Sequence, residues 1–110
     1  MTERKERIEN RRWYEVTLPN QDDPFCYLFS ESLNSALERV SNIRESKPPI
    51  TPDIRELSKE EAGVLKEIIK SSTTMSYRIA MRKGIRGTIV RNGFPVSVGN
   101  LIRERLTKAS

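Results

Sequence analysis

The dipeptide Asn92-Gly93 constrains the fold more than any other feature of this sequence. Asparagine followed by glycine adopts the positive φ angles of a type I′ turn, which joins two antiparallel strands. The flanking runs 88–91 and 94–98 therefore form a hairpin, and Pro95 places the second strand at a sheet edge or bulge. Counting outwards from the turn gives its register: Arg91 opposite Phe94, Ile89 opposite Val96, Val90 opposite Pro95, Thr88 opposite Ser97, and Gly87 facing Val98.

Two further strands are predicted near the N-terminus. Tyr14, Val16 and Leu18 alternate with polar residues, the pattern of a half-buried strand that ends at Pro19. After the turn-rich segment 20–24, the apolar run 25–29 predicts a second strand antiparallel to the first. Five of the seven aromatic residues belong to these two strands, namely Trp13, Tyr14, Phe25, Tyr27 and Phe29.

Those five aromatic residues have two interpretations. Aromatic rings pack well between a sheet and a helix, so we expect them in the core. The alternative is a stacking platform for single-stranded nucleic acid, which the acidic residues around them oppose. Cys26 lies among them and is expected to be a buried small apolar residue.

Three helices are predicted from apolar spacing and capping residues. The first begins after Ser30 or Ser32 and the second after Ser58, which forms a capping box with Glu61. The third, shorter, begins at Gly99 or Asn100. The apolar face of the first helix is Leu33, Ala36, Leu37, Val40 and Ile43. That of the second is Val64, Leu65, Ile68 and Ile69, and this helix stops at Ser71, Ser72, Thr73 and Thr74. That of the third is Leu101, Ile102 and Leu106.

The segment 75–82 is ambiguous. Met75, Tyr77, Ile79 and Met81 alternate with the residues between them, which favours a strand with Arg78 and Arg82 on its polar face. Methionine and alanine also tolerate a helix. We predict a strand, followed by a flexible basic turn over 83–87.

The chain is expected to fold as one domain. Residues 1–12 are mostly charged and predict a frayed helix or a mobile arm, while prolines in 44–57 predict a stiff connector. The halves on either side of this connector are too small to bury separate cores, and only 35% of the residues are hydrophobic. We therefore predict a single α+β domain over 13–110, with an antiparallel sheet packed against two main helices and a short C-terminal helix.

The residue inventory argues against several functional classes. The chain has no histidine and one cysteine, so catalytic triads, histidine–metal sites and internal disulfides are ruled out. Asp22 and Asp23 precede a proline in a turn, and Glu45 and Lys47 lie at a helix end, so neither pair resembles a magnesium-dependent nuclease site. We expect no catalytic activity, no catalytic residues, no metal site and no cofactor.

The expected location is the cytoplasm. A single cysteine suits a reducing compartment. Residues 1–12 lack the apolar core of a signal peptide, and no stretch approaches the roughly 18 apolar residues of a membrane span. We expect no membrane partner.

Charge is segregated along the chain. Residues 73–110 contain eight basic residues and one acidic residue, Glu104, whereas residues 13–57 contain four basic and eight acidic residues. The net charges are +7 and −4, a contrast that the overall +5 conceals. Strongly basic segments favour phosphate or acidic protein surfaces as partners.

Five basic residues are the candidate site. Arg78, Arg82, Lys83 and Arg86 fall within nine residues with no acid between them, and Arg91 adjoins the hairpin turn. Arginine binds phosphate with two parallel hydrogen bonds. We expect non-catalytic binding of DNA or RNA by a small regulatory or accessory protein. The alternatives left open are an interaction or inhibitor protein that docks this basic face on an acidic surface of a larger cellular machine, and a solvated face without a partner.

Overall fold

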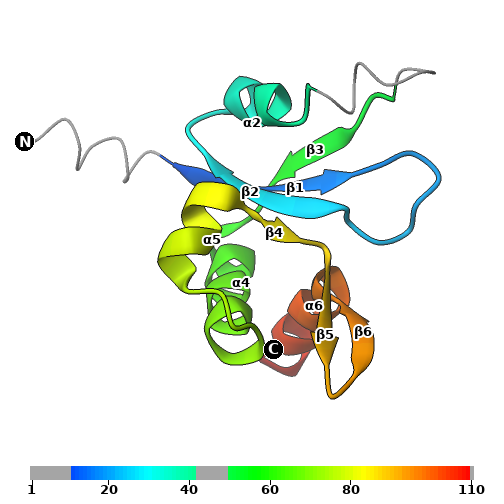
Figure 1. Cartoon of the computed structure of the whole chain (residues 1–110), viewed down its shortest axis with the longest axis vertical. Helices are drawn as coiled ribbons and strands as arrows, with labels where there is room; N and C mark the ends of the chain where they lie inside the picture. The colour runs from blue at the N-terminus through cyan, green and yellow to red at the C-terminus, as the bar shows by residue number, and fades with distance from the viewer. Residues whose placement is uncertain (1–10, 42–49, 110) are drawn as a thin grey trace, which may run out of the picture.

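The computed structural model describes residues 11–41 and 50–109. It confirms a small single α+β domain with an antiparallel sheet (Figure 1). The elements in chain order are β1 (Arg12–Thr17), β2 (Cys26–Ser30), α2 (Leu33–Arg39), β3 (Asp53–Glu56), α4 (Lys59–Ser72), α5 (Tyr77–Lys83), β4 (Ile85–Arg86), β5 (Thr88–Arg91), β6 (Phe94–Ser97) and α6 (Val98–Ala109). Residues 1–10 of the predicted arm and 44–49 of the predicted connector, with Glu45 and Lys47, lie outside the described residues.

The main sheet has the strand order β3-β1-β2-β4, with every neighbouring pair antiparallel. The two predicted N-terminal strands are β1 and β2, paired with Glu15 opposite Tyr27. Strands β3 and β4 were not predicted. Strand β3 falls within the stretch interpreted as a connector, and Pro52 immediately precedes it, where a missing N–H group interrupts no hydrogen bond of the strand.

Both faces of the sheet are covered by helices, so the prediction of a half-buried first strand is wrong. Tyr14 and Val16 face α2, where they pack with Leu28, Ala36 and Val40. Alternate side chains of the same strands point to the opposite face, where Trp13, Tyr27 and Phe29 pack in a larger core with α4 and α6 residues. Figure 1 shows α2 on one side of the sheet and α4 and α6 on the other.

Capping residues set the starts of two predicted helices. Ser32 begins α2, and its hydroxyl accepts a hydrogen bond from the Ser35 amide. Ser58 and Glu61 form the predicted capping box of α4. Leu65, Ile68 and Ile69 are buried as expected, but Leu33 is 46% exposed and does not belong to the core face of α2. Ile43 lies outside the described residues.

The strand predicted over 75–82 is wrong, because this segment forms α5. Ser76 caps the helix by accepting a hydrogen bond from the Ile79 amide, and Gly84 ends it with a φ of 82°. Ala80 is completely buried and Tyr77 and Met81 are partly buried, which is the i, i+3, i+4 spacing of a helical face. The alternation of large side chains obscured this pattern because the inward residue, Ala80, is the smallest of the set.

The predicted hairpin is confirmed with its register. Strands β5 and β6 pair with Ile89 opposite Val96 and Arg91 opposite Phe94. They form a separate two-stranded sheet, which a hydrogen bond from the Val98 amide to the Gly87 carbonyl extends by one pair and which the Gly87 amide joins to the domain by donating to the Phe25 carbonyl. Helix α6 then starts at Val98, and Leu101 and Ile102 are buried as predicted.

Over the described ranges 11–41 and 50–109, we find no helix with both the length and the apolar character needed to cross a lipid bilayer.

Candidate functional site

Three of the five predicted basic residues line one groove, which we call the basic groove. Lys83 ends α5, Arg86 lies in β4 and Arg91 ends β5, and all three are exposed. The groove has a volume of about 1130 Å³. Arg78 and Arg82 are also exposed, on α5, but they do not line it. The structure therefore divides the predicted site into a groove and a separate helix surface.

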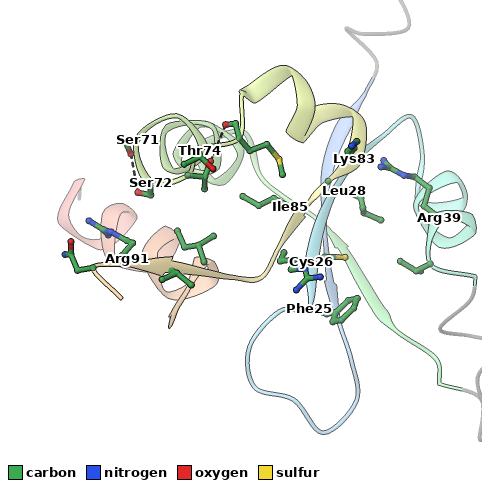
Figure 2. A pocket seen from close by; sticks show the side chains of 18 residues that line it. Phe25, Cys26, Leu28, Arg39, Ser71, Ser72, Thr74, Lys83, Ile85 and Arg91 are labelled. Carbon is green, nitrogen blue, oxygen red and sulfur yellow. Dashed lines mark hydrogen bonds between the residues drawn. The ribbon is translucent and has the colours of Figure 1, made fainter. Parts of the chain in front are cut away.

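The groove also contains a basic residue from the acidic half of the chain, Arg39 of α2. Figure 2 shows Arg39 and Lys83 at one end of the groove and Arg91 at the other. Every charged residue among its described lining residues is basic. A concave surface lined by charges of one sign concentrates the electrostatic field, so this groove attracts anions.

Arg39 also joins α2 to two other elements. Its guanidinium donates to the carbonyl oxygens of Phe29 at 2.9 Å and Arg82 at 2.9 Å. The second bond reaches the last turn of α5, where unpaired carbonyl groups favour a positive charge. Arg39 thus holds the end of α5, and with it Lys83, against the sheet.

Two glycines allow the segment that carries Lys83 and Arg86 to lie close to β2. A Cβ atom at Gly84 would stand 2.8 Å from the carbonyl oxygen of Tyr27, and one at Gly87 would overlap the carbonyl oxygen of Pro24. The Gly87 amide donates to the Phe25 carbonyl at 2.8 Å. The stretch 83–87 was predicted as a flexible turn, but it consists of the end of α5, strand β4 and a tightly packed glycine.

Phe25 is the exception among the five aromatic residues of the N-terminal strands. Trp13, Tyr14 and Tyr27 are buried and Phe29 packs against the core, as expected. Phe25 is 44% exposed and lines the basic groove. Phe25 also lines a second, smaller hollow together with Asp22 and Asp23, so it borders both the basic groove and acidic surface.

Hydroxyl groups from the end of α4 form another wall of the groove. Ser71 and Thr73 donate to the carbonyl oxygens of Glu67 and Ile69 one helical turn back. Ser72 and Thr74 line the same wall, and Figure 2 shows both beside the groove. The sequence predicts these residues only as the end of a helix, because nothing local relates them to the basic segment.

Cys26 lies at the side of the groove and is half-buried. Burial raises the pKa of its thiol to about 11, and the nearby charge of Arg39 opposes this shift only in part. The thiol therefore stays protonated at neutral pH, which makes it a poor nucleophile. Cys26 contributes packing to the groove wall.

A different charged cluster, at the β3 edge, pairs one arginine with two glutamates. Arg55 donates to both carboxylate oxygens of Glu61, at 3.0 and 2.8 Å, and lies 3.3 Å from an oxygen of Glu15. Glu15 also accepts a hydrogen bond from the buried Tyr27 hydroxyl at 2.9 Å. The hydrogen bonds from Arg55 hold the pKa of Glu61 at about 2, below its ordinary value.

Among residues 11–41 and 50–109, no group of three or more histidine, cysteine, aspartate and glutamate side chains is arranged to hold a metal ion. Compared with known proteins, the chain matches no protein-family model, no curated protein and no solved structure, so no functional site can be transferred from a relative.

Proposed function

We propose that this protein binds nucleic acid without catalysing a reaction, as a small regulatory or accessory protein. The observation that supports the proposal best is the basic groove, whose charged lining residues are all arginine or lysine in the described chain. Phosphates are the most abundant targets for such a surface, and arginine satisfies them with two hydrogen bonds. We also propose a cytoplasmic location, because the only cysteine suits a reducing compartment.

Lys83, Arg86 and Arg91 are suited to phosphate because no carboxylate within residues 11–41 and 50–109 forms an ion pair with them. The ion pairs of the described residues involve Arg11 and Arg55, and not Lys83, Arg86 or Arg91. An arginine already paired with a carboxylate must lose that partner before it binds an anion. Lys83, Arg86 and Arg91 are instead exposed to water, so phosphate binding to them releases counterions and does not displace a carboxylate.

The test is binding of a fluorescein-labelled 12-mer oligonucleotide, followed by anisotropy at about 50 to 200 mM salt. We expect binding that weakens with salt, and a triple variant with Lys83→Ala, Arg86→Ala and Arg91→Ala that loses most of it. If each residue neutralises one phosphate of a single strand, the slope of log affinity against log salt should become less negative by about 2.

The matched control removes three positive charges outside the groove, by Lys59→Ala, Lys70→Ala and Lys108→Ala. These lysines are exposed on α4 and α6. We expect this control to retain most of the affinity, since the net charge is the same as in the triple variant. Equal losses in both variants, or no binding by the unchanged protein at 50 mM salt, would contradict the proposal. An Arg78→Ala, Arg82→Ala variant measures any contribution from α5.

A protein partner is the second candidate, in which an interaction or inhibitor protein docks on a larger cellular machine through the basic face. It is favoured by exposed apolar residues on the hairpin, where Phe94 is 71% exposed and Val90 is 69% exposed, close to Arg91. Aromatic and arginine side chains are enriched at protein interfaces. A stoichiometric protein that co-purifies from extract after nuclease treatment, and is lost in Phe94→Ser, would favour this candidate.

A further inference from the structure

We infer that the basic groove takes a single strand of nucleic acid, with one unpaired base stacked on Phe25. This inference rests on the proposed function and specifies the form of the ligand. It depends on the position of Phe25, which lines the same groove as Lys83, Arg86 and Arg91. The sequence does not suggest this, because Phe25 lies in the acidic half of the chain and far from these residues along it.

The first step of the argument is the shape of the cationic surface. Lys83 and Arg91 lie at opposite ends of a concave groove (Figure 2), whereas a protein element that reads a duplex projects into one of its grooves. A single strand can lie along such a concavity with its phosphates on the cations. Cationic grooves that follow one backbone are the usual surface for single strands.

The second step is the composition of the groove floor. Leu28, Ile85 and Ile89 line it but are buried, and the apolar side chains of Phe25 and Val90, which also line it, are exposed. Duplex backbone carries phosphate and sugar on its outside, which gain little from apolar groups. The face of an unpaired base is apolar, so burying it against this floor removes hydrophobic surface from water.

The third step is the exposure of Phe25. Its amide donates to the Val16 carbonyl at 2.7 Å and its carbonyl accepts from Gly87, so the backbone of this residue is fixed at both sides. The ring is nevertheless 44% exposed, unlike the buried aromatic residues Trp13, Tyr14 and Tyr27. On a fixed backbone, the exposed ring has only two side-chain torsions to order when a base stacks on it.

The fourth step concerns the direction in which the phosphates of the bound strand lie relative to Phe25. Asp22 and Asp23 line the second hollow that Phe25 borders and repel phosphates there. In the basic groove, Lys83, Arg86 and Arg91 attract them. A strand whose base stacks on Phe25 therefore directs its phosphates toward β4 and β5, away from the loop between β1 and β2.

The experiment compares three fluorescein-labelled probes at about 50 mM salt: the DNA 12-mer dT12, the RNA 12-mer U12, and a 12-base-pair DNA duplex. We expect at least one single-stranded probe to bind at least tenfold more tightly than the duplex. Tighter binding of dT12 or of U12 then identifies which of the two single strands the groove prefers. Equal or tighter binding of the duplex overturns the inference but leaves nucleic-acid binding intact, while no binding of any probe contradicts both.

Variants of Phe25 test the stacked base directly. Phe25→Leu should weaken binding of the preferred single strand at least about fivefold, the minimum expected for the loss of one stacked base. Phe25→Tyr retains the ring and should bind within about twofold of the unchanged protein. Phe94→Leu, which removes an exposed ring outside the groove, is the matched control and should have no effect. Equal affinities for Phe25→Leu and Phe25→Tyr would overturn the inference.

Discussion

The two edge strands of the main sheet, β3 and β4, each carry one arginine, and the surroundings of the two arginines are opposite. Arg55 of β3 lies opposite Glu15 of β1 and binds both Glu15 and Glu61. Arg86 of β4 lies opposite Cys26 of β2, and no ion pair to a carboxylate of the described residues reaches it. The same residue type therefore stabilises the fold at one edge and remains available to a ligand at the other.

The cross-strand neighbour decides which role each arginine takes. A guanidinium beside two carboxylates forms hydrogen bonds that contribute to folding, and its positive charge is cancelled locally. A guanidinium beside a protonated thiol keeps its charge for other anions. We therefore expect the β3 edge to govern stability and the β4 edge to govern binding, and the following changes test that division.

The largest effect is expected at Gly87, which permits the close approach of the β4 edge to Pro24. Gly87→Ala places a Cβ atom on the Pro24 carbonyl oxygen, so the backbone must move. We expect the free energy of unfolding, measured in urea, to fall by about 3 kcal/mol or more. Gly63→Ala is the control, because Gly63 lies in α4 with no atom within 4 Å of the added Cβ, and it should stabilise the protein by about 0.5 to 1 kcal/mol. Equal stability of the two variants would show that β4 does not depend on this contact.

The next effect is a pair of opposite results: Arg55→Ala should lower stability, and Arg86→Ala should lower oligonucleotide affinity. Each variant removes one positive charge from an edge strand. Arg55→Ala removes the ion-pair partner of Glu15 and Glu61. Since Arg55 is half-exposed, we expect a loss of stability of only about 1 to 2 kcal/mol with oligonucleotide affinity nearly unchanged.

Arg86→Ala should have the converse result. Its stability should stay within about 0.5 kcal/mol of the unchanged protein, as for most surface substitutions. Its affinity for the oligonucleotide should fall about tenfold, the effect of one charged hydrogen bond. Urea unfolding and anisotropy on both variants measure the four values. Similar affinity losses in both would mean that net charge, and not the groove, controls binding.

The smallest effect is the dependence of folding stability on acidic pH at Glu61. The pKa of Glu61 is held at about 2, below its ordinary 4.5, so its ionised form stabilises the fold above about pH 4.5 and this contribution is lost as the pH falls toward 2. Glu61→Gln keeps a side chain suited to the capping box but removes the charge. At pH 7 it should be about 1 kcal/mol less stable than the unchanged protein, and the difference should vanish near pH 2. Glu60→Gln, which removes an exposed carboxylate from the same helical turn, is the control for the loss of one negative charge.

Some features were determined by the sequence alone because they depend on neighbouring residues. Asn92-Gly93 sets the hairpin and its register, since the turn requires positive φ angles and the pairing follows by counting. Ser58 and Glu61 set the start of α4 because they satisfy each other across one helical turn. The charge segregation likewise identified the basic segment that carries Lys83, Arg86 and Arg91.

Other features were decided only by the tertiary structure. The segment 77–83 is compatible with two periodicities, and the burial of Ala80 against the core selects the helix. Arg39 and Phe25 join the basic groove although they lie in the acidic half of the chain, because α2 and the start of β2 pack beside α5 and β4. Arg55 is neutralised by Glu15, forty residues away in sequence. Turns and caps arise from contacts within a few residues, whereas the surroundings of a charged side chain depend on distant segments that only folding brings together.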